Sequence, residues 1–191
     1  TWDASGHPVA VGAGSSGEFL KSQGAGSVPV FAAAGGGLVT QVQSATITGT
    51  LSTTSTTLTD MTGLTVTCTS LVSTDKVLVT GSVRIGNGSV GDRSFFSLIR
   101  DSTEIGQGAA AGSRYRTHTN VINSFTSGIK EGVISFLDSP SATGSVTYKM
   151  QWRLQTGAGS TVYCNRMGVD SDAANWARCS STINATVIDG S

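Results

Sequence analysis

The sequence predicts an all-β protein, a β-sandwich or barrel preceded by a Gly-rich extended arm. Two observations favour this fold class: many short stretches alternate apolar with polar residues, and Gly, Ser, Asn and Asp clusters separate them. The clearest stretch is residues 146–155, where every second residue is apolar. Its apolar positions are Val146, Tyr148, Met150, Trp152 and Leu154. This period of two predicts a central strand with one buried and one solvated side.

Residues 1–43 differ in composition from the rest of the chain. Nine of them are Gly, three are charged, and no periodicity is evident. Such a segment buries little apolar surface by itself, so we expect an extended arm with one or two short strands, either flexible or laid against a neighbour. The sequence thus predicts two parts, an arm over residues 1–43 and a β-sandwich over residues 44–191.

From residue 44 onward, about nine or ten strands are expected, at the spacing typical of a sandwich or barrel. Asn87-Gly88 after the third of them predicts a hairpin turn, and Asp138-Ser-Pro140 is expected to end another. No helix longer than a turn or two is expected. The predicted strands are residues 45–51, 64–72, 76–85, 94–100, 103–108, 117–125, 132–137, 146–155, 160–164 and 178–188.

Two of these stretches, residues 94–100 and 132–137, carry apolar residues on both sides. Such strands need cover on both sides, which a single two-layer sandwich does not supply. The excess apolar surface indicates either a subunit interface or strands at the centre of a barrel.

Charge and hydropathy exclude several classes of partner. The 12 basic and 12 acidic residues give a formal net charge of zero, and only 13% of residues are charged. Phosphate backbones attract clustered Lys and Arg, so nucleic acid is not expected as a partner. The apolar runs are short, so membrane insertion is not expected either, and no signal peptide is visible.

The three cysteines do not indicate a disulfide scaffold or a zinc site. Cys68 shares its alternating side with Leu64 and Val66, so we expect a buried thiol. Cys164 and Cys179 are able to pair if their strands are neighbours, which the sequence leaves open.

No motif supports catalysis or a cofactor. Residues 12–17 fit the letters of a dinucleotide-binding loop, but the segment that follows is too short and too Gly-rich for the helix this mechanism needs. Asp170-Ser-Asp172 resembles the start of a calcium loop without the later Gly and Glu. His7 and His118 lack partners suited to acid–base chemistry. We therefore expect no enzyme activity, no catalytic residue, no cofactor and no metal.

The candidates for receptor binding are Arg114, Tyr115, Arg116 and Trp176. Tyr and Arg are favoured at binding hot spots, and an indole is able to stack on a sugar ring. The alternatives are a strand with ordinary solvated ends for residues 114–116 and a core or interface anchor for Trp176.

Two stretches resemble phage tail-fibre and related virion proteins. Residues 15–31, followed by a Gly-rich run, look like the segment Gly-Gln-x-Leu-x-Ser-x-Gly-x-x-x-x-Pro-x-Phe/Trp common ahead of fibre tip domains, with Glu18 where Gln is usual. The rest of the chain is similar to those tip domains in the order of several short motifs. These are Leu98-Ile-Arg100-Asp101, Leu137-Asp-Ser-Pro140, Thr147-Tyr148, Asn165-Arg166 and Ser180-Ser-Thr-Ile183. The final strand departs from the acidic ending frequent in those domains.

The resemblance implies a jelly-roll tip similar in shape to C1q and tumour-necrosis-factor domains, which form homotrimers. It implies a non-enzymatic protein in an external virion appendage, such as a tail fibre or spike tip. Its partners would be further copies of itself, other virion proteins and a glycan or protein of the host surface. The alternative is a purely architectural capsid or head-fibre decoration, or a filament subunit assembled through the N-terminal arm.

Overall fold

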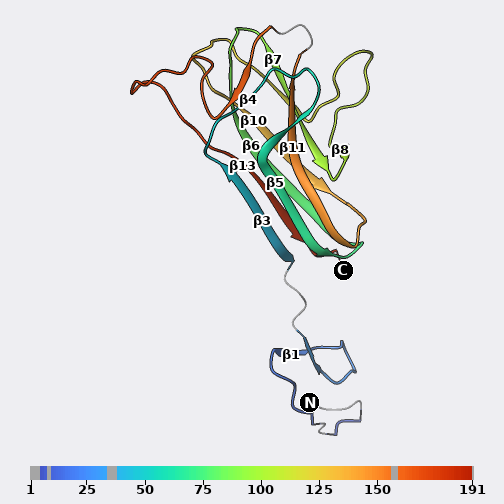
Figure 1. Ribbon diagram of the computed structural model, residues 1–191. Helices are drawn as coiled ribbons and strands as arrows, with labels where there is room; N and C mark the ends of the chain where they lie inside the picture. Colours follow the sequence, from blue (N-terminus) through green and yellow to red (C-terminus); the bar gives the residue numbers. More distant parts are fainter. Residues whose placement is uncertain (1–4, 8–9, 34–37, 156–158, 191) are drawn as a thin grey trace. The chain divides into compact units, whose positions relative to one another are not determined.

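The computed structural model describes residues 5–7, 10–33, 38–155 and 159–190, and these contain β-strands and no helix. The chain divides into two compact units, residues 1–38 and residues 39–191 (Figure 1). The second unit is a sandwich of two antiparallel sheets, so the predicted all-β sandwich is confirmed.

The first unit contains an antiparallel pair, β1 (Glu18–Lys21) and β2 (Val30–Ala33). The backbone N–H of Glu18 donates to the carbonyl of Ser15, and the Glu18 carboxylate accepts from the Ser15 N–H at 2.6 Å. A strand therefore begins directly after the glycines of residues 12–17. This agrees with the exclusion of a dinucleotide loop, which requires a helix at this point.

One sheet of the sandwich has six strands in the order β3-β13-β6-β12-β4, with β10 also paired to β6. β6 is long enough to pair with β13 and β12 in succession along one edge and with β10 along the other. β3 starts at Val39, ahead of the predicted start of the sandwich at residue 44 and of its first strand at residue 45. The bounds are β3 (Val39–Ile47), β4 (Leu51–Thr53), β6 (Lys76–Asn87), β10 (Lys130–Asp138), β12 (Val162–Cys164) and β13 (Ser181–Ile188).

The other sheet has five strands in the order β5-β11-β7-β8, with β9 also paired to β7. β11 lies between β5 and β7. All five predicted apolar positions of β11 are buried, so the prediction of a central strand is confirmed. The bounds are β5 (Thr59–Leu71), β7 (Arg93–Arg100), β8 (Thr103–Ile105), β9 (Thr119–Ile122) and β11 (Gly144–Leu154).

The core lies between the two sheets, where their inward side chains meet. Trp152 and Tyr148 are its largest fully buried side chains, and Cys68 is buried as predicted. Neighbouring strands are distant in sequence: β13 pairs with β3 and β6, and β11 with β5 and β7. This crossed arrangement is consistent with a jelly roll.

The hairpin predicted at Asn87-Gly88 is wrong. β6 and β7 belong to different sheets, so the chain crosses between layers after Asn87 instead of reversing beside itself. The Asn87 side chain is buried and holds this crossing: its Nδ2 donates to the Asp92 carbonyl at 2.6 Å, and Ser94 Oγ donates to its Oδ1 at 3.2 Å. Burial and long-range pairing decided this conformation over local turn preference.

A partly buried ion pair joins the two sheets. Asp138 is the last residue of β10. Arg100 Nη1 donates to both of its carboxylate oxygens, at 2.9 and 3.0 Å. It also accepts from the Tyr148 hydroxyl at 2.7 Å. Burial, and after it the adjacent carboxylate, raises the pKa of Tyr148, so this hydroxyl stays a donor. The sequence predicted Asp138 as part of the segment that ends a strand. In the structure it ends β10, and it is also a buried polar residue.

The described part of the chain contains no helix long and apolar enough to span a bilayer.

Candidate binding surfaces

The outward side of β3, β13, β6 and β10 is the first candidate surface, and we call it the open face. β3 and β13 contain no charged residue, and the charges of β6 and β10 lie toward the strand ends. At one end, Arg84 and Glu131 form an ion pair across β6 and β10. The outward residues between these ends are Val42, Ser44, Thr46, Leu78, Thr80, Ser82, Val133, Ser135, Leu137, Thr182, Asn184 and Thr186.

Apolar side chains on the open face reach solvent. Val42, Val133 and Leu137 are 63%, 55% and 51% exposed. A shallow hollow of about 250 Å³ lies between β6, β10 and β13 and is lined mainly by small polar and aliphatic groups. A neutral, partly apolar sheet surface of this kind resembles the core of a protein–protein interface more than an ordinary solvated surface.

The second candidate surface is the outward side of β7 and β11, which we call the covered face because residues 106–118 fold over part of it. The Tyr115 ring packs on Phe95 of β7, with ring centroids 4.9 Å apart at a steep angle. The Arg153 guanidinium of β11 lies 4.0 Å from the centroid of the same ring. The Thr117 hydroxyl and the backbone N–H of His118 both donate to the carbonyl of Phe96. These two hydrogen bonds hold the end of the segment on β7.

This arrangement corrects part of the expectation for the doubly apolar strands. β7 is buried on both sides, and its outward Ile99 is only 4% exposed. The chain itself covers the Phe95 part of β7, so no subunit is needed there. β10 is different, because Val133 and Leu137 remain uncovered.

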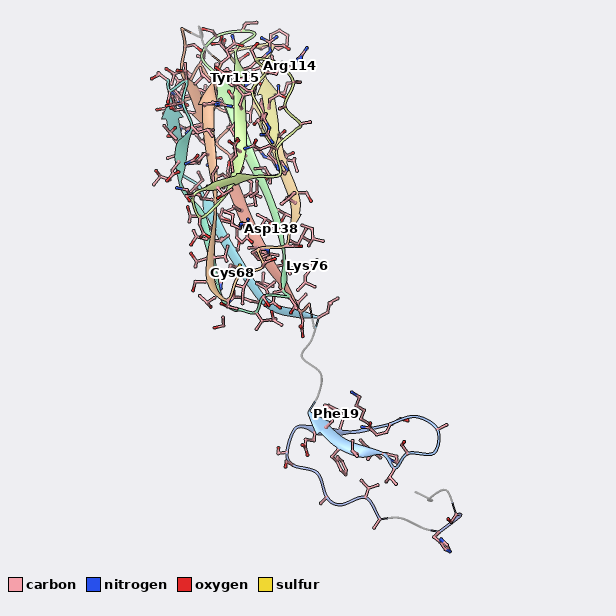
Figure 2. All side chains as sticks on the ribbon, turned by 90° about the vertical axis from the view of Figure 1, so that its right-hand side faces the viewer. Phe19, Cys68, Lys76, Arg114, Tyr115 and Asp138 are labelled. Carbon is pink, nitrogen blue, oxygen red and sulfur yellow. The ribbon has the colours of Figure 1, made fainter. Side chains whose placement is uncertain are left out.

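The predicted binding residues Arg114, Tyr115 and Arg116 lie together on the covering segment. Arg114 and Arg116 are exposed, whereas Tyr115 is half-buried. Figure 2 shows Arg114 and Tyr115 near one end of the sandwich, and Cys68 and Lys76 near the other. A hollow of about 480 Å³ adjoins them, lined by Arg93, Phe95, Ser113, Arg114, Tyr115, Thr117, Asn120 and Gln155.

The sequence reasoning missed three residues of this site, Arg93, Arg153 and Gln155. Alternation placed Arg153 and Gln155 on the polar side of residues 146–155, whereas Arg93 lies just ahead of the predicted strand 94–100 and had no signal of its own. Their proximity depends on the pairing of Arg153 with Phe95, which is a register between distant strands. Arg93 Nη1 donates to Gln155 Oε1 at 3.0 Å and ties the two strand ends together.

Trp176 lies elsewhere, on the loop between β12 and β13. It is half-buried and lines a separate hollow of about 360 Å³ with Asp170, Ser171, Asp172, Ala173, Ala177 and Arg178. The four predicted binding residues thus fall on two loops, and the two hollows share no residue.

Asp170 has a structural explanation. Its carboxylate pairs with Arg178 Nη2 at 2.6 Å and with Arg166 Nη1 at 3.2 Å. The Arg166 guanidinium in turn lies 3.7 Å from the Tyr163 ring centroid. Two arginines neutralise this carboxylate and fix the start of the loop. Within the described ranges, no group of three or more His, Cys, Asp or Glu side chains gathers as a metal site would require.

His118 is half-buried and packs against Phe136, with ring centroids 6.2 Å apart. Burial lowers its pKa, and hydrogen bonds to the backbone of Gly106 and Ser135 offset part of that effect. Its Nδ1 has no partner among the described atoms. Packing on Phe136 and hydrogen bonds to backbone groups account for the position of this ring.

The three cysteines carry free thiols, so the pairing left open for Cys164 and Cys179 is not formed. Cys164 is buried, and its Sγ lies 3.3 Å from Ser181 Oγ. Burial raises the pKa of both Cys68 and Cys164, which keeps these thiols protonated and unreactive.

Comparisons with known proteins give no family for this chain. No protein-family model matches it, and no curated protein does. Among solved structures, it is similar to a chain of the structure of infectious bursal disease virus, Gx strain, with a TM-score of 0.42 and 11% sequence identity. The match covers 97% of this chain and 40% of that chain. A likeness this distant carries no argument about function.

Proposed function

We propose that the protein is a non-enzymatic structural component of a virion that associates with copies of itself through the open face. In this proposal the sandwich is the tip of an external appendage, a tail fibre or spike. It forms a homotrimer and presents its loops to a glycan or protein of the host surface. Repetition of a weak site in one assembly would strengthen attachment through avidity.

The open face is the observation that supports self-association. It is uncharged between its ends, so a second copy meets no like-charge repulsion there. Its exposed valines and leucine offer apolar area whose burial contributes about 25 cal/mol per Å². The similarity of residues 15–31 to the segment ahead of fibre tips supports the virion location.

A second candidate function is purely architectural, with the protein as a capsid decoration or filament subunit held by its arm. The feature that favours it is the first unit, where Phe19 and Leu20 of β1 are 65% and 55% exposed. A small strand pair with uncovered apolar side chains gains stability when it docks on a neighbouring protein. The arm would then bind other virion proteins.

Light scattering of the full-length chain, together with retention of the labelled chain on host cells, tests the first function. A trimer that is retained on cells supports the attachment protein. A monomer at all concentrations up to about 100 μM, or a trimer that no host cell retains, contradicts it. Protease resistance of residues 10–33 only in larger assemblies would support the architectural function instead.

A further inference from the structure

The arginines of this chain divide into two groups of four. Arg84, Arg100, Arg166 and Arg178 each form an ion pair with a carboxylate. The other four form none with any residue that the structure describes. These are Arg93, Arg114, Arg116 and Arg153, and we call them the arginine cluster.

The arginine cluster gathers around Tyr115. Arg153 lies against the Tyr115 ring and directs Nη2 to the Arg116 carbonyl at 3.5 Å. Arg114 donates to the Ala111 carbonyl at 3.2 Å, and Arg116 Nε to the Gly108 carbonyl at 3.0 Å. These contacts hold the side chains with neutral acceptors and leave their charges without a counterion.

One polar atom of the cluster is buried without a partner. Arg153 Nε has no acceptor among the described residues, although solvent does not reach it. A guanidinium carries five N–H donors, and only part of that capacity is used at each of these residues. In a chain with zero net charge, four unneutralised guanidiniums on one surface produce a local positive potential.

Among the described residues, acidic side chains of the neighbouring strands form no ion pair with this cluster, and Asp60 beside β11 pairs with Lys149 instead. Asp92 precedes Arg93, but it is buried and its carboxylate accepts from Ser160 Oγ. Glu104 is the strand partner of Ile99, four residues along β7 from Phe95. Its Oε1 is buried without a hydrogen-bond partner. Neither carboxylate forms an ion pair with the arginine cluster.

The hollow beside the cluster adds neutral hydrogen-bonding groups to the charge. Arg93 and Arg114 line it together with Ser113, Thr117, Asn120 and Gln155. Hydroxyl and amide groups of this kind bind sugar hydroxyls, and arginines bind carboxylate or phosphate in a bidentate manner. A volume of about 480 Å³ lies within the range of small-ligand sites.

The state of Tyr115 argues against a nucleic acid as the ligand. Single-stranded nucleic acids bind by stacking bases on open aromatic rings along a positive groove. Here Arg153 covers one side of the Tyr115 ring, and Phe95 packs against the ring as well. The ring supports the arginines instead of receiving a base.

We propose that the arginine cluster and its hollow bind an acidic saccharide, a sugar chain that carries carboxylate or phosphate groups. The acidic groups are held by Arg93 and Arg114, and the sugar hydroxyls by Asn120 and Gln155. Arg153 supports Tyr115, which keeps the covering segment in place. This proposal names the ligand class for the attachment role proposed above, but it does not depend on self-association.

The test is calorimetric titration of the full-length chain with four probes at low salt. These are hexagalacturonate for carboxylate, pentamannosyl 6-phosphate for phosphate, maltohexaose as a neutral oligosaccharide, and a dT oligonucleotide. We expect binding of one or both acidic oligosaccharides, and the stronger of the two identifies the acidic group. Raising the salt to 0.5 M should weaken this binding at least fivefold, since exposed charges are screened.

The double substitution R93Q/R114Q should weaken that binding at least tenfold. Its matched control is R178Q, the same substitution at an exposed arginine that is paired with Asp170, which should change the affinity less than twofold. Both variants alter surface side chains, and a circular dichroism melt confirms that they fold.

Several results would overturn the proposal. One is absence of binding to both acidic probes; others are equal binding of maltohexaose or equal loss in R178Q. Oligonucleotide binding that is stronger than saccharide binding and lost in R93Q/R114Q would assign the surface to nucleic acid. Light scattering of the same sample separates this test from the assembly proposal. A monomer that binds hexagalacturonate would support the saccharide site and contradict only the trimer.

Discussion

β7 and β10 both carry apolar residues on their two sides, yet only the outward side of β7 is covered by another part of the chain. β7 is covered by its own chain, with Tyr115 on Phe95 and Ile99 only 4% exposed. β10 keeps Val133 and Leu137 at the surface, on a sheet face without charge between its ends. The difference shows that an apolar outward side marks a candidate interface only after the covering by nearby loops has been taken into account.

The largest effect is expected where the two layers are joined. Asp138→Asn removes the charge that Arg100 and Tyr148 share, and breaking this partly buried ion pair is expected to cost about 2 to 3 kcal/mol of unfolding free energy. The matched control is Asp60→Asn, which breaks the surface pair with Lys149 and should cost less than about 1 kcal/mol. Urea denaturation measures both; equal effects would show that the Asp138 pair stabilises the fold no more than a surface pair does.

Removing the cover from β7 should cost less. Tyr115→Ala deletes the ring between Phe95 and Arg153, and we expect a loss of about 2 kcal/mol in unfolding free energy. Leu137→Ala on β10 should change the unfolding free energy of the dilute chain by less than about 0.5 kcal/mol, because that side chain is half exposed.

Varying the protein concentration should separate the effects of Leu137→Ala and Tyr115→Ala further. If the open face binds a second copy, the effect of Leu137→Ala on the denaturation midpoint grows with protein concentration, because association stabilises the folded chain. The effect of Tyr115→Ala should stay constant over the same range. A concentration-dependent effect at Tyr115 alone would reverse the assignment of the two faces.

A smaller loss of stability is expected when the pH is lowered. Burial holds the pKa of His118 below its ordinary value, so the unfolded chain takes up this proton first, and stability falls as the pH drops below about 6.5. Asp60 has a lowered pKa, mainly through the hydrogen bond from Gln151 and then that from Lys149, so its contribution is lost only below about 3.8.

Urea midpoints between pH 7 and pH 3 separate these two windows. His118→Gln should flatten the curve in the upper window and leave the lower window unchanged, and Asp60→Asn should do the reverse. A curve that keeps its upper-window slope in His118→Gln would remove His118 from this account.

The sequence predicted the local pattern of the fold well. Alternation identified the buried side of β11, the buried position of Cys68 and the approximate place of most strands, because a side-chain period of two depends only on neighbouring residues. The sequence-based prediction failed at Asn87. The dipeptide Asn-Gly is typical of a hairpin turn, but here it begins a crossing between sheets in which the Asn87 side chain is buried.

The candidate site was only partly predictable for the same reason. Arg114, Tyr115 and Arg116 are consecutive in the chain and were identified together. Arg93 and Arg153 join them through strand register and loop folding, which depend on contacts between distant residues. Trp176 was grouped with them as a binding residue, but it lies on another loop and lines another hollow.

The central claim is that the open face is where the protein binds its own copies, and substitution of that face tests it most directly. Val133→Glu/Leu137→Glu places two charges on outward β10 positions, and Thr65→Glu/Thr67→Glu does the same on exposed positions of β5. Light scattering should find a trimer for the unmodified chain and for the β5 variant, and a folded monomer for the β10 variant. A monomeric unmodified chain, or a β10 variant that remains trimeric, would contradict the account.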